Sequence, residues 1–338
     1  MSDIKTEFCK LELKSPIIAG ASGLTSSLDN LKRIEDCGAG AVVLKSILEE
    51  EIQLERLKLE EDLSEIDNKS PEMIDVFPEL EYIGPEENIR FVEKASEALS
   101  IPVFGSLNAV KLSTWVEYAL LIENAGASGI ELNFYSFPSE FTKSSSEIED
   151  EMIKTFREVK KAVSIPICVK LSPYFTNALN FIGRLDGESP DGIDIFNRSF
   201  EPGADVEKLE LNSPFNLSLA RDHRLAMRYS GILYGKIKAS LCASGGVTGY
   251  KEALSCILAG ADCVSAVTAL YKDGMDWITE TNKQIENWMS EKNYASLKDF
   301  RGLLSRGSTD KPWLYKRAHY AKLLLNTEKV TERDFAES

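Results

Sequence analysis

The chain has 338 residues, of which 43% are hydrophobic and 28% charged, a composition typical of globular proteins and not of fibres or disordered chains. The formal net charge of −15 argues against nucleic acid and anionic membranes as partners, because both require a basic surface. Neither a signal-peptide pattern nor a membrane-spanning apolar run is found, so we expect a cytoplasmic protein that acts on a small-molecule substrate.

The cysteines and the acidic runs indicate no special chemistry. Six cysteines are scattered without a C-x-x-C pair or a histidine cluster, which predicts buried free thiols and neither a metal site nor a disulfide framework. The acidic runs Glu49–Glu51 and Glu147–Glu151 are interpreted as solvated helix faces.

From Ser15 onward, short apolar runs alternate with longer helical patterns, which is typical of parallel strands joined by crossover helices. Eight such runs are predicted as strands, each flanked by Gly, Pro, Ser or Asn. They are Pro16–Ala19, Ala41–Leu44, Pro102–Gly105, Gly129–Leu132, Pro166–Leu171, Gly192–Phe196, Lys238–Ala243 and Asp262–Ala266.

The apolar spacing between these runs predicts seven helices. They are Leu28–Cys37, Glu86–Leu99, Ser113–Ala125, Ser146–Val163, Arg221–Ile232, Tyr250–Leu258 and Trp277–Met289. Three of them end in a glycine that precedes the next strand, where glycine can take the left-handed cap conformation. This rhythm predicts an α/β protein of the (β/α)8 TIM-barrel class.

Other segments frame the predicted barrel. A small hairpin over Thr6–Leu13 precedes it, Glu49–Glu81 forms a charged insertion, Thr142–Ser146 forms a loop, and the tail from Ser296 shows no strand pattern. We expect one domain over residues 1–338, with the barrel over about 6–293 and a C-terminal extension over about 294–338.

Polar residues follow the predicted strands, at the end of a barrel where active sites lie. They are Ser22, Lys45, Ser46, Asn108, Asn133, Ser136, Lys170, Asn197, Gly245, Gly246 and Thr268. A mouth lined by lysines, asparagines and small residues suits a planar ligand with carbonyls and ring nitrogens, plus a phosphate.

Two of these residues, Lys45 and Lys170, lie at the ends of apolar runs, where a buried ammonium group requires a compensating anion. A lysine in a barrel can also form a Schiff base, so an aldolase is the main alternative enzyme class. Gly245 and Gly246 offer backbone N–H groups ahead of a helix, an arrangement that holds phosphate. Neither His223 nor His319 can be assigned as a catalytic base.

Several motifs in order resemble the dihydroorotate dehydrogenase family over about residues 6–293. They are Ser15–Gly23, Leu44-Lys45-Ser46, Glu131-Leu132-Asn133 with Ser136, Val169–Pro173, Asn197 and Ser244–Val247. The resemblance implies an FMN-dependent oxidoreductase and a homodimer. It assigns FMN binding to Ser22, Lys45, Ser46, Asn108, Asn133, Lys170, Gly245, Gly246 and Thr268.

The resemblance also implies catalytic roles for Ser136, Lys45 and Lys170. Ser136, three residues after Asn133, takes the position of the base, while Lys170 lies near the flavin ring. Lys45, Asn133 and Asn197 would hold the substrate, and Arg198 can meet a substrate carboxylate. Quinone-linked relatives carry an N-terminal apolar helix that is not found here, which leaves fumarate, NAD through a partner subunit, or another soluble acceptor.

The chain departs from the family pattern in four places. Pro138 stands where an asparagine is expected, and Met73–Pro78 replaces an asparagine-rich loop that grips orotate. Val267 replaces a glycine on the phosphate side, and the turn Asn216–Leu219 has no glycine. We therefore expect oxidation of dihydroorotate or a related cyclic amide. The alternatives are a lysine-dependent aldolase, a phosphate-sugar isomerase, or a flavin-binding protein with little turnover.

Overall fold

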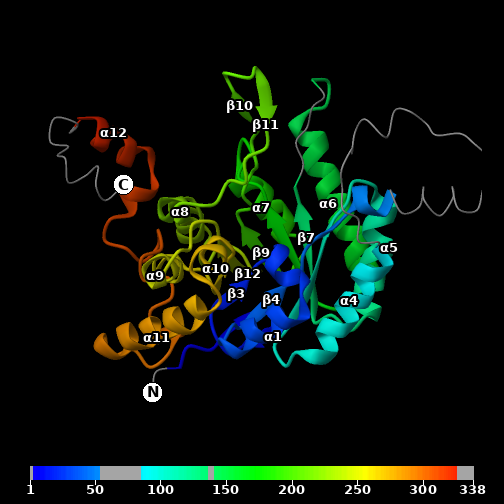
Figure 1. Ribbon diagram of the computed structural model, residues 1–338. Helices are drawn as coiled ribbons and strands as arrows, with labels where there is room; N and C mark the ends of the chain where they lie inside the picture. Colours follow the sequence, from blue (N-terminus) through cyan, green and yellow to red (C-terminus); the bar gives the residue numbers. More distant parts are fainter. Residues whose placement is uncertain (1–2, 54–84, 136–140, 326–338) are drawn as a thin grey trace, which may run out of the picture.

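The computed structural model describes residues 3–53, 85–135 and 141–325, and in this part of the chain parallel strands close into a barrel (Figure 1). Along the sheet, β4 pairs with β3 and then follow β13, β12, β9, β8, β7 and β6, while β4 also pairs with β6 and so closes the ring. The strands are β3 (Ile17–Ala19), β4 (Ala41–Val43) with its continuation β5 (Ile47–Leu48), β6 (Val103–Asn108), β7 (Gly129–Phe134), β8 (Ile167–Leu171), β9 (Gly192–Ile195), β12 (Ser240–Ser244) and β13 (Cys263–Ala266). The predicted (β/α)8 barrel is confirmed.

Helices cover the outside of the barrel between successive strands (Figure 1). They are α1 (Leu28–Asp36), α4 (Pro85–Ala98), α5 (Leu112–Asn124), α6 (Ser145–Ala162), α7 (Ala178–Asp186), α8 (His223–Leu233), α9 (Tyr250–Ala259), α10 (Thr268–Asp273) and α11 (Asp276–Glu291). The seven predicted helices are confirmed to within two residues at each end. The prediction missed α7 and α10, which have only nine and six residues.

Alternation along the strands divides the core in two. Side chains facing the barrel interior include Ile18, Phe104 and the thiols of Cys168, Cys242 and Cys263, which form one buried cluster. Side chains of the opposite parity pack against the helices in a second, larger cluster. The prediction of buried thiols is confirmed for every cysteine except Cys37, which is half-buried.

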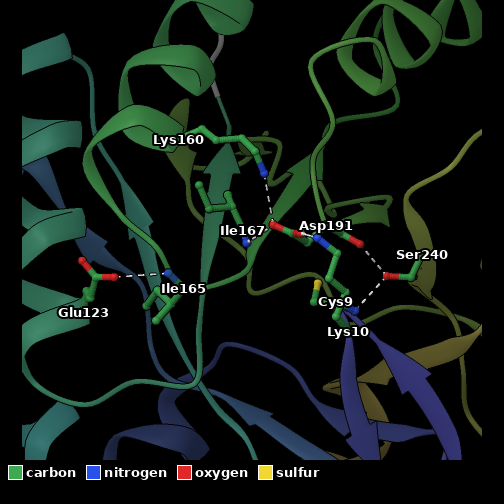
Figure 2. A network of polar contacts seen from close by, with 8 residues as sticks. All are labelled: Cys9, Lys10, Glu123, Lys160, Ile165, Ile167, Asp191 and Ser240. Carbon is green, nitrogen blue, oxygen red and sulfur yellow. Dashed lines mark hydrogen bonds and ion pairs between the residues drawn. The ribbon is translucent and has the colours of Figure 1, made fainter.

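A hairpin made of β1 (Thr6–Phe8) and β2 (Leu11–Leu13) closes the N-terminal end of the barrel. Figure 2 shows how its turn is held: the Cys9 N–H donates to Ser240 Oγ at 2.8 Å, and Lys10 Nζ lies 2.6 Å from Asp191 Oδ1. A Cβ atom at Gly192 would lie 2.4 Å from Cys9 Sγ, so only glycine lets the hairpin approach this closely. The closed lower end leaves the C-terminal ends of the strands as the mouth.

Two further segments lie outside the barrel rhythm. A second hairpin rises above the mouth (Figure 1), and the segment after α11 docks on α8 and α9, where Phe300 is fully buried and Gly302 N–H donates to Ile257 O at 3.1 Å. The remaining elements are β10 (Gly203–Asp205), β11 (Glu210–Asn212), the 3-10 turns η1 (Gly23–Ser26), η2 (Ala220–Asp222), η3 (Leu297–Asp299) and η4 (Pro312–Tyr315), and α12 (Arg317–Leu325).

The acidic run after β5 is not a solvated face, so that prediction was wrong. Glu49 and Glu51 are buried, and the Glu49 carboxylate accepts hydrogen bonds from the backbone N–H groups of Val110 and of Lys111, the latter at 2.7 Å. Glu49 therefore caps the start of α5, where unpaired N–H groups favour an anion. The run in α6 does carry exposed acids, as predicted, and most of the predicted insertion lies outside the described residues.

Over residues 3–53, 85–135 and 141–325, no helix combines the length and apolar character needed to cross a bilayer.

Candidate active site

Several of the polar residues predicted at the strand ends line one cavity at the mouth of the barrel, whereas Lys45 lines another. A cavity of about 130 Å³ is lined by Lys170, Asn197, Arg198, Gly245, Gly246 and Thr268 together with Ser218. A neighbouring cavity of about 630 Å³ shares Asn197, Arg198 and Gly245 with it. Together these cavities fall in the range of about 300–1,000 Å³ typical of small-molecule sites.

Three asparagines form a hydrogen-bonded set at this mouth. Asn108 Nδ2 donates to the backbone oxygen of Asn133 at 2.7 Å, and Asn197 Nδ2 donates to Asn133 Oδ1 at 2.8 Å. The three residues come from β6, from β7 and from the segment after β9. Their mutual bonds fix the amide orientations, which is the preorganisation that recognition of a polar planar ligand requires.

Lys170 forms the floor of the mouth and is almost fully buried. Its Nζ lies 3.3 Å from Asp194 Oδ2 and 3.7 Å from Glu131 Oε2, and all three side chains are less than 10% exposed. Burial alone would lower the pKa of Lys170, but the carboxylates of Glu131 and Asp194 outweigh it and raise the pKa. Lys170 therefore stays charged, and the compensating negative charge comes from acidic side chains of the same barrel.

Lys45 differs from Lys170, and the expectation that it is buried was wrong. Its side chain is 41% exposed, and its Nζ pairs with Glu51 Oε1 at 3.1 Å. The reason is local, because β4 ends at Val43 and the backbone leaves the sheet before β5 begins. Ser46 does face the barrel, since its Oγ lies 2.7 Å from Ser106 Oγ on β6.

Gly245 and Gly246 turn the chain sharply after β12. Both have positive φ values, +88° and +73°, which favour glycine. In the part of the chain that the structure describes, their backbone N–H groups donate to no acceptor. Successive free N–H groups in such a turn are suited to hold a phosphate or another anion.

The segment before α8 closes the mouth beside these glycines. Ser218 N–H donates to Thr268 Oγ1 at 3.0 Å, and Arg198 Nη1 pairs with Asp222 Oδ2 at 2.8 Å. Within the described residues, Arg198 Nε and Ser22 Oγ are buried without a hydrogen-bond partner. A polar ligand bound at the mouth would give the Arg198 donor a partner. Ser136 lies outside the described residues.

Sequence reasoning missed Glu131, Asp194 and Ser106, which contact Lys170 directly or through one another. The signal was available, because Glu131 and Asp194 are each flanked by apolar residues within a predicted strand. A charged residue inside an apolar strand faces the barrel interior and requires a partner there.

The two glycines offer a matched test of the turn. We expect Gly246→Ala to lower stability by about 1–2 kcal/mol or more from the left-handed conformation alone, and to disrupt the turn further. The added Cβ would lie 2.4 Å from His223 N and 2.6 Å from Leu219 O. Gly245→Ala is the control, because the nearest atom to its Cβ is 3.7 Å away and only the conformational cost remains. Thermal or denaturant unfolding of both variants measures the difference, and equal losses would contradict the packing argument.

Known proteins from several organisms are similar to this chain in sequence. The chain is 26% identical over 323 residues to the catalytic subunit of dihydroorotate dehydrogenase B (NAD(+)) from Thermoplasma volcanium, covering 90% of this chain and 99% of that protein. It is 26% identical over 312 residues to the subunit of the same name from Methanothermobacter thermautotrophicus, covering 89% and 98%. The corresponding subunit from Brachyspira hyodysenteriae is 31% identical over 152 residues, which are 44% of this chain and 50% of that protein.

A profile of the dihydroorotate dehydrogenase family matches residues 80–289, which is more than half of the chain. This range contains the asparagine set, the Lys170 floor and the Gly245-Gly246 turn. Members of this family are oxidoreductases that act on CH–CH groups. The barrel, the polar mouth and the profile agree, and the chain belongs to the dihydroorotate dehydrogenase family.

Proposed function

We propose that this protein is an FMN-dependent oxidoreductase that oxidises dihydroorotate or a related cyclic amide. The observation that carries the proposal is Lys170, a buried lysine that stays charged directly beneath a mouth lined by asparagines. A fixed cation there stabilises negative charge that develops on a ligand during reduction, without reorganisation of the site.

The residues present fit FMN in their chemistry. The free N–H groups of Gly245 and Gly246, with Ser218 and Thr268 beside them, form a donor set for a phosphate. At the other side of the mouth, Lys170, Asn108 and Asn133 offer the polar groups that a flavin ring needs, with Ser22, Lys45 and Ser46 near the ends of the first strands. Phe200 and Phe215 border the smaller cavity and are 49% and 65% exposed, so they offer aromatic surface at its edge.

FMN, when bound, supplies the acceptor for a hydride. The residues of the chain then position the substrate and handle its proton. Asn133 and Asn197 are already oriented by their shared hydrogen bond, and Arg198, which pairs with Asp222, lies at the mouth beside them. By its position three residues after Asn133, Ser136 is proposed as the base, whose hydroxyl would take the proton from the carbon beside a carbonyl. A serine is a weak base unless water or a second hydroxyl relays the proton, so activity should rise with pH.

The Schiff-base alternative finds less support. A lysine nucleophile must be neutral to attack a carbonyl. The acidic side chains beside Lys170 raise its pKa, so it stays protonated, and Lys45 is paired with Glu51. The family membership also favours an oxidoreductase over an aldolase or a phosphate-sugar isomerase.

Several relatives are named as NAD(+)-linked catalytic subunits, which makes an accessory electron-transfer subunit the first acceptor to test. The homodimer stays a prediction.

Cofactor analysis tests the proposal directly. We expect the purified protein to be yellow and to release FMN on denaturation, identified by absorbance, chromatography and mass. The control is Lys236→Met, which removes an exposed lysine remote from the mouth. It should retain the same amount of FMN as the wild type. A colourless protein that also fails to take up added FMN would contradict the flavin proposal. Reduction of the bound flavin by a substrate then separates an enzyme from a flavin-binding protein with little turnover.

A further inference from the structure

Beneath the mouth, one lysine faces two carboxylates in a buried cluster. Lys170 contacts Glu131 and Asp194, and the two carboxylate side chains are only 3% exposed. The nearby thiols of Cys168 and Cys242 add no charge, because burial raises the pKa of both. With both carboxylates ionised the cluster carries one uncompensated negative charge, which is costly in a dry interior. One additional proton makes the cluster neutral.

Glu131 is the member best placed to carry that proton. Asp194 lies closer to Lys170 Nζ, at 3.3 Å against 3.7 Å for Glu131, so its electrostatic attraction to the ammonium group is stronger. Burial raises the pKa of Glu131, and the charge of Asp194 acts in the same direction, against the opposing effects of Lys170 and Ser106. The proton that neutralises the cluster therefore belongs on Glu131.

A pair of hydroxyl groups connects Glu131 to the outside. Ser106 Oγ donates to Glu131 Oε1 at 3.0 Å, and Ser46 Oγ lies 2.7 Å from Ser106 Oγ, where either atom can be the donor. Ser106 and Lys45 line a cavity of about 280 Å³ that also contacts α4. Because hydroxyl groups both donate and accept, such a chain can pass a proton in either direction.

We propose that Glu131 exchanges a proton with solvent through Ser106 and Ser46, and that its protonation follows the charge of the ligand above Lys170. At a pH where Glu131 is partly ionised, negative charge added above Lys170 makes a second negative charge at Glu131 more costly, so Glu131 takes up a proton from solvent. When that charge leaves, the proton is released. Glu131 is thus a positioning residue that sets the charge Lys170 presents to the mouth. For the identity of the ligand, this inference rests on the proposed flavin function.

The first experiment measures the reduction potential of the FMN-loaded protein as a function of pH. Glu131→Gln is uncharged at every pH, like the protonated acid. We expect the wild-type and Glu131→Gln curves to coincide at acidic pH and to diverge as pH rises, with the wild type harder to reduce. Glu123→Gln, at the opposite end of the barrel (Figure 2), should follow the wild type. Curves that coincide throughout, or that differ by a constant offset, would overturn the proposal.

The proton route is tested by kinetics. After a pH jump, Ser106→Ala is expected to exchange the Glu131 proton more slowly than the wild type, because the hydroxyl that touches the carboxylate is gone. Unchanged exchange kinetics would remove Ser106 and Ser46 from the proposal.

A second experiment needs no cofactor. Infrared titration of the cofactor-free protein should show a carboxylic-acid carbonyl band that persists above the ordinary range of glutamate, is lost in Glu131→Gln and is kept in Glu123→Gln. Glu131→Asp retains an ionisable group and should keep such a band at a shifted frequency, which provides a readout if Glu131→Gln does not fold. Failure to bind FMN would reject the proposed function and leave this titration to decide on Glu131. Identical spectra of the wild type and Glu131→Gln at every pH would reject the inference about Glu131.

Discussion

Replacing Lys170 with methionine is expected to lower the free energy of unfolding by about 3–5 kcal/mol, because it leaves buried carboxylates without their cation. Glu131 and Asp194 are both 3% exposed and both contact Lys170 Nζ. Methionine matches the length of the lysine stem, so the loss reports the charge and not a large cavity. Denaturant unfolding measures it, with Lys236→Met on the surface as the control.

Two further measurements separate charge from packing at this position. Adding Glu131→Gln and Asp194→Asn to Lys170→Met should recover much of the lost stability, since the uncompensated charges are then gone. In FMN-loaded protein, Lys170→Met should also slow flavin reduction by roughly 10²-fold or more, the effect typical of removing a preorganised group that stabilises developing charge. Normal reduction of FMN by the Lys170→Met variant would show that Lys170 does not face the flavin.

Turnover of dihydroorotate is expected to be weak compared with that of family members that carry the full asparagine set. Orotate is planar and has a carboxylate and several amide-like edges, so its site needs a donor for each buried oxygen. Pro138 has no side-chain donor, and its ring removes the backbone donor as well. Each lost hydrogen bond to a buried group costs on the order of 1–3 kcal/mol. Two missing amides, one at Pro138 and one in Met73–Pro78, therefore predict a loss of roughly a hundredfold or more in binding.

Steady-state kinetics with dihydroorotate and a soluble dye acceptor tests this prediction. Pro138→Asn should improve the use of dihydroorotate by about tenfold, the value of one recovered hydrogen bond. Dihydrouracil-type analogues without the carboxylate show whether Arg198, which pairs with Asp222 at the mouth, contributes to recognition of that group. Efficient turnover of dihydroorotate by the wild type at micromolar concentrations would contradict the claim that the pocket has changed.

Much of the barrel could be predicted from local sequence. Strand and helix periods, and the glycines that end three helices, depend on neighbouring residues, so the sequence alone predicts the strands and seven of the helices. The prediction missed the short helix α7, because two turns of apolar spacing between strands are a weak signal. The prediction also missed the hairpin of β10 and β11, since its residues are largely exposed and do not alternate between buried and exposed positions.

The candidate site divides in the same way. The position of a polar residue after a strand predicts that it reaches the mouth, and this holds for the asparagines, Lys170 and the two glycines. The sequence pattern does not predict how deeply each side chain is buried. Lys45 also follows a strand, yet it is 41% exposed because β4 ends two residues earlier.

By itself, the sequence determined the order of strands and helices and the set of polar residues at the strand ends, because both follow from periods of two and 3.6 residues along the chain. Only the tertiary structure decided which of these residues meet. Closure and register set Lys170 opposite Asp194 on the neighbouring strand and bring Glu131 to the same ammonium group. Glu49, which the sequence predicts as a surface acid, caps the start of α5 in the closed barrel. Which partners a buried side chain meets is a property of the closed barrel, and no local pattern encodes it.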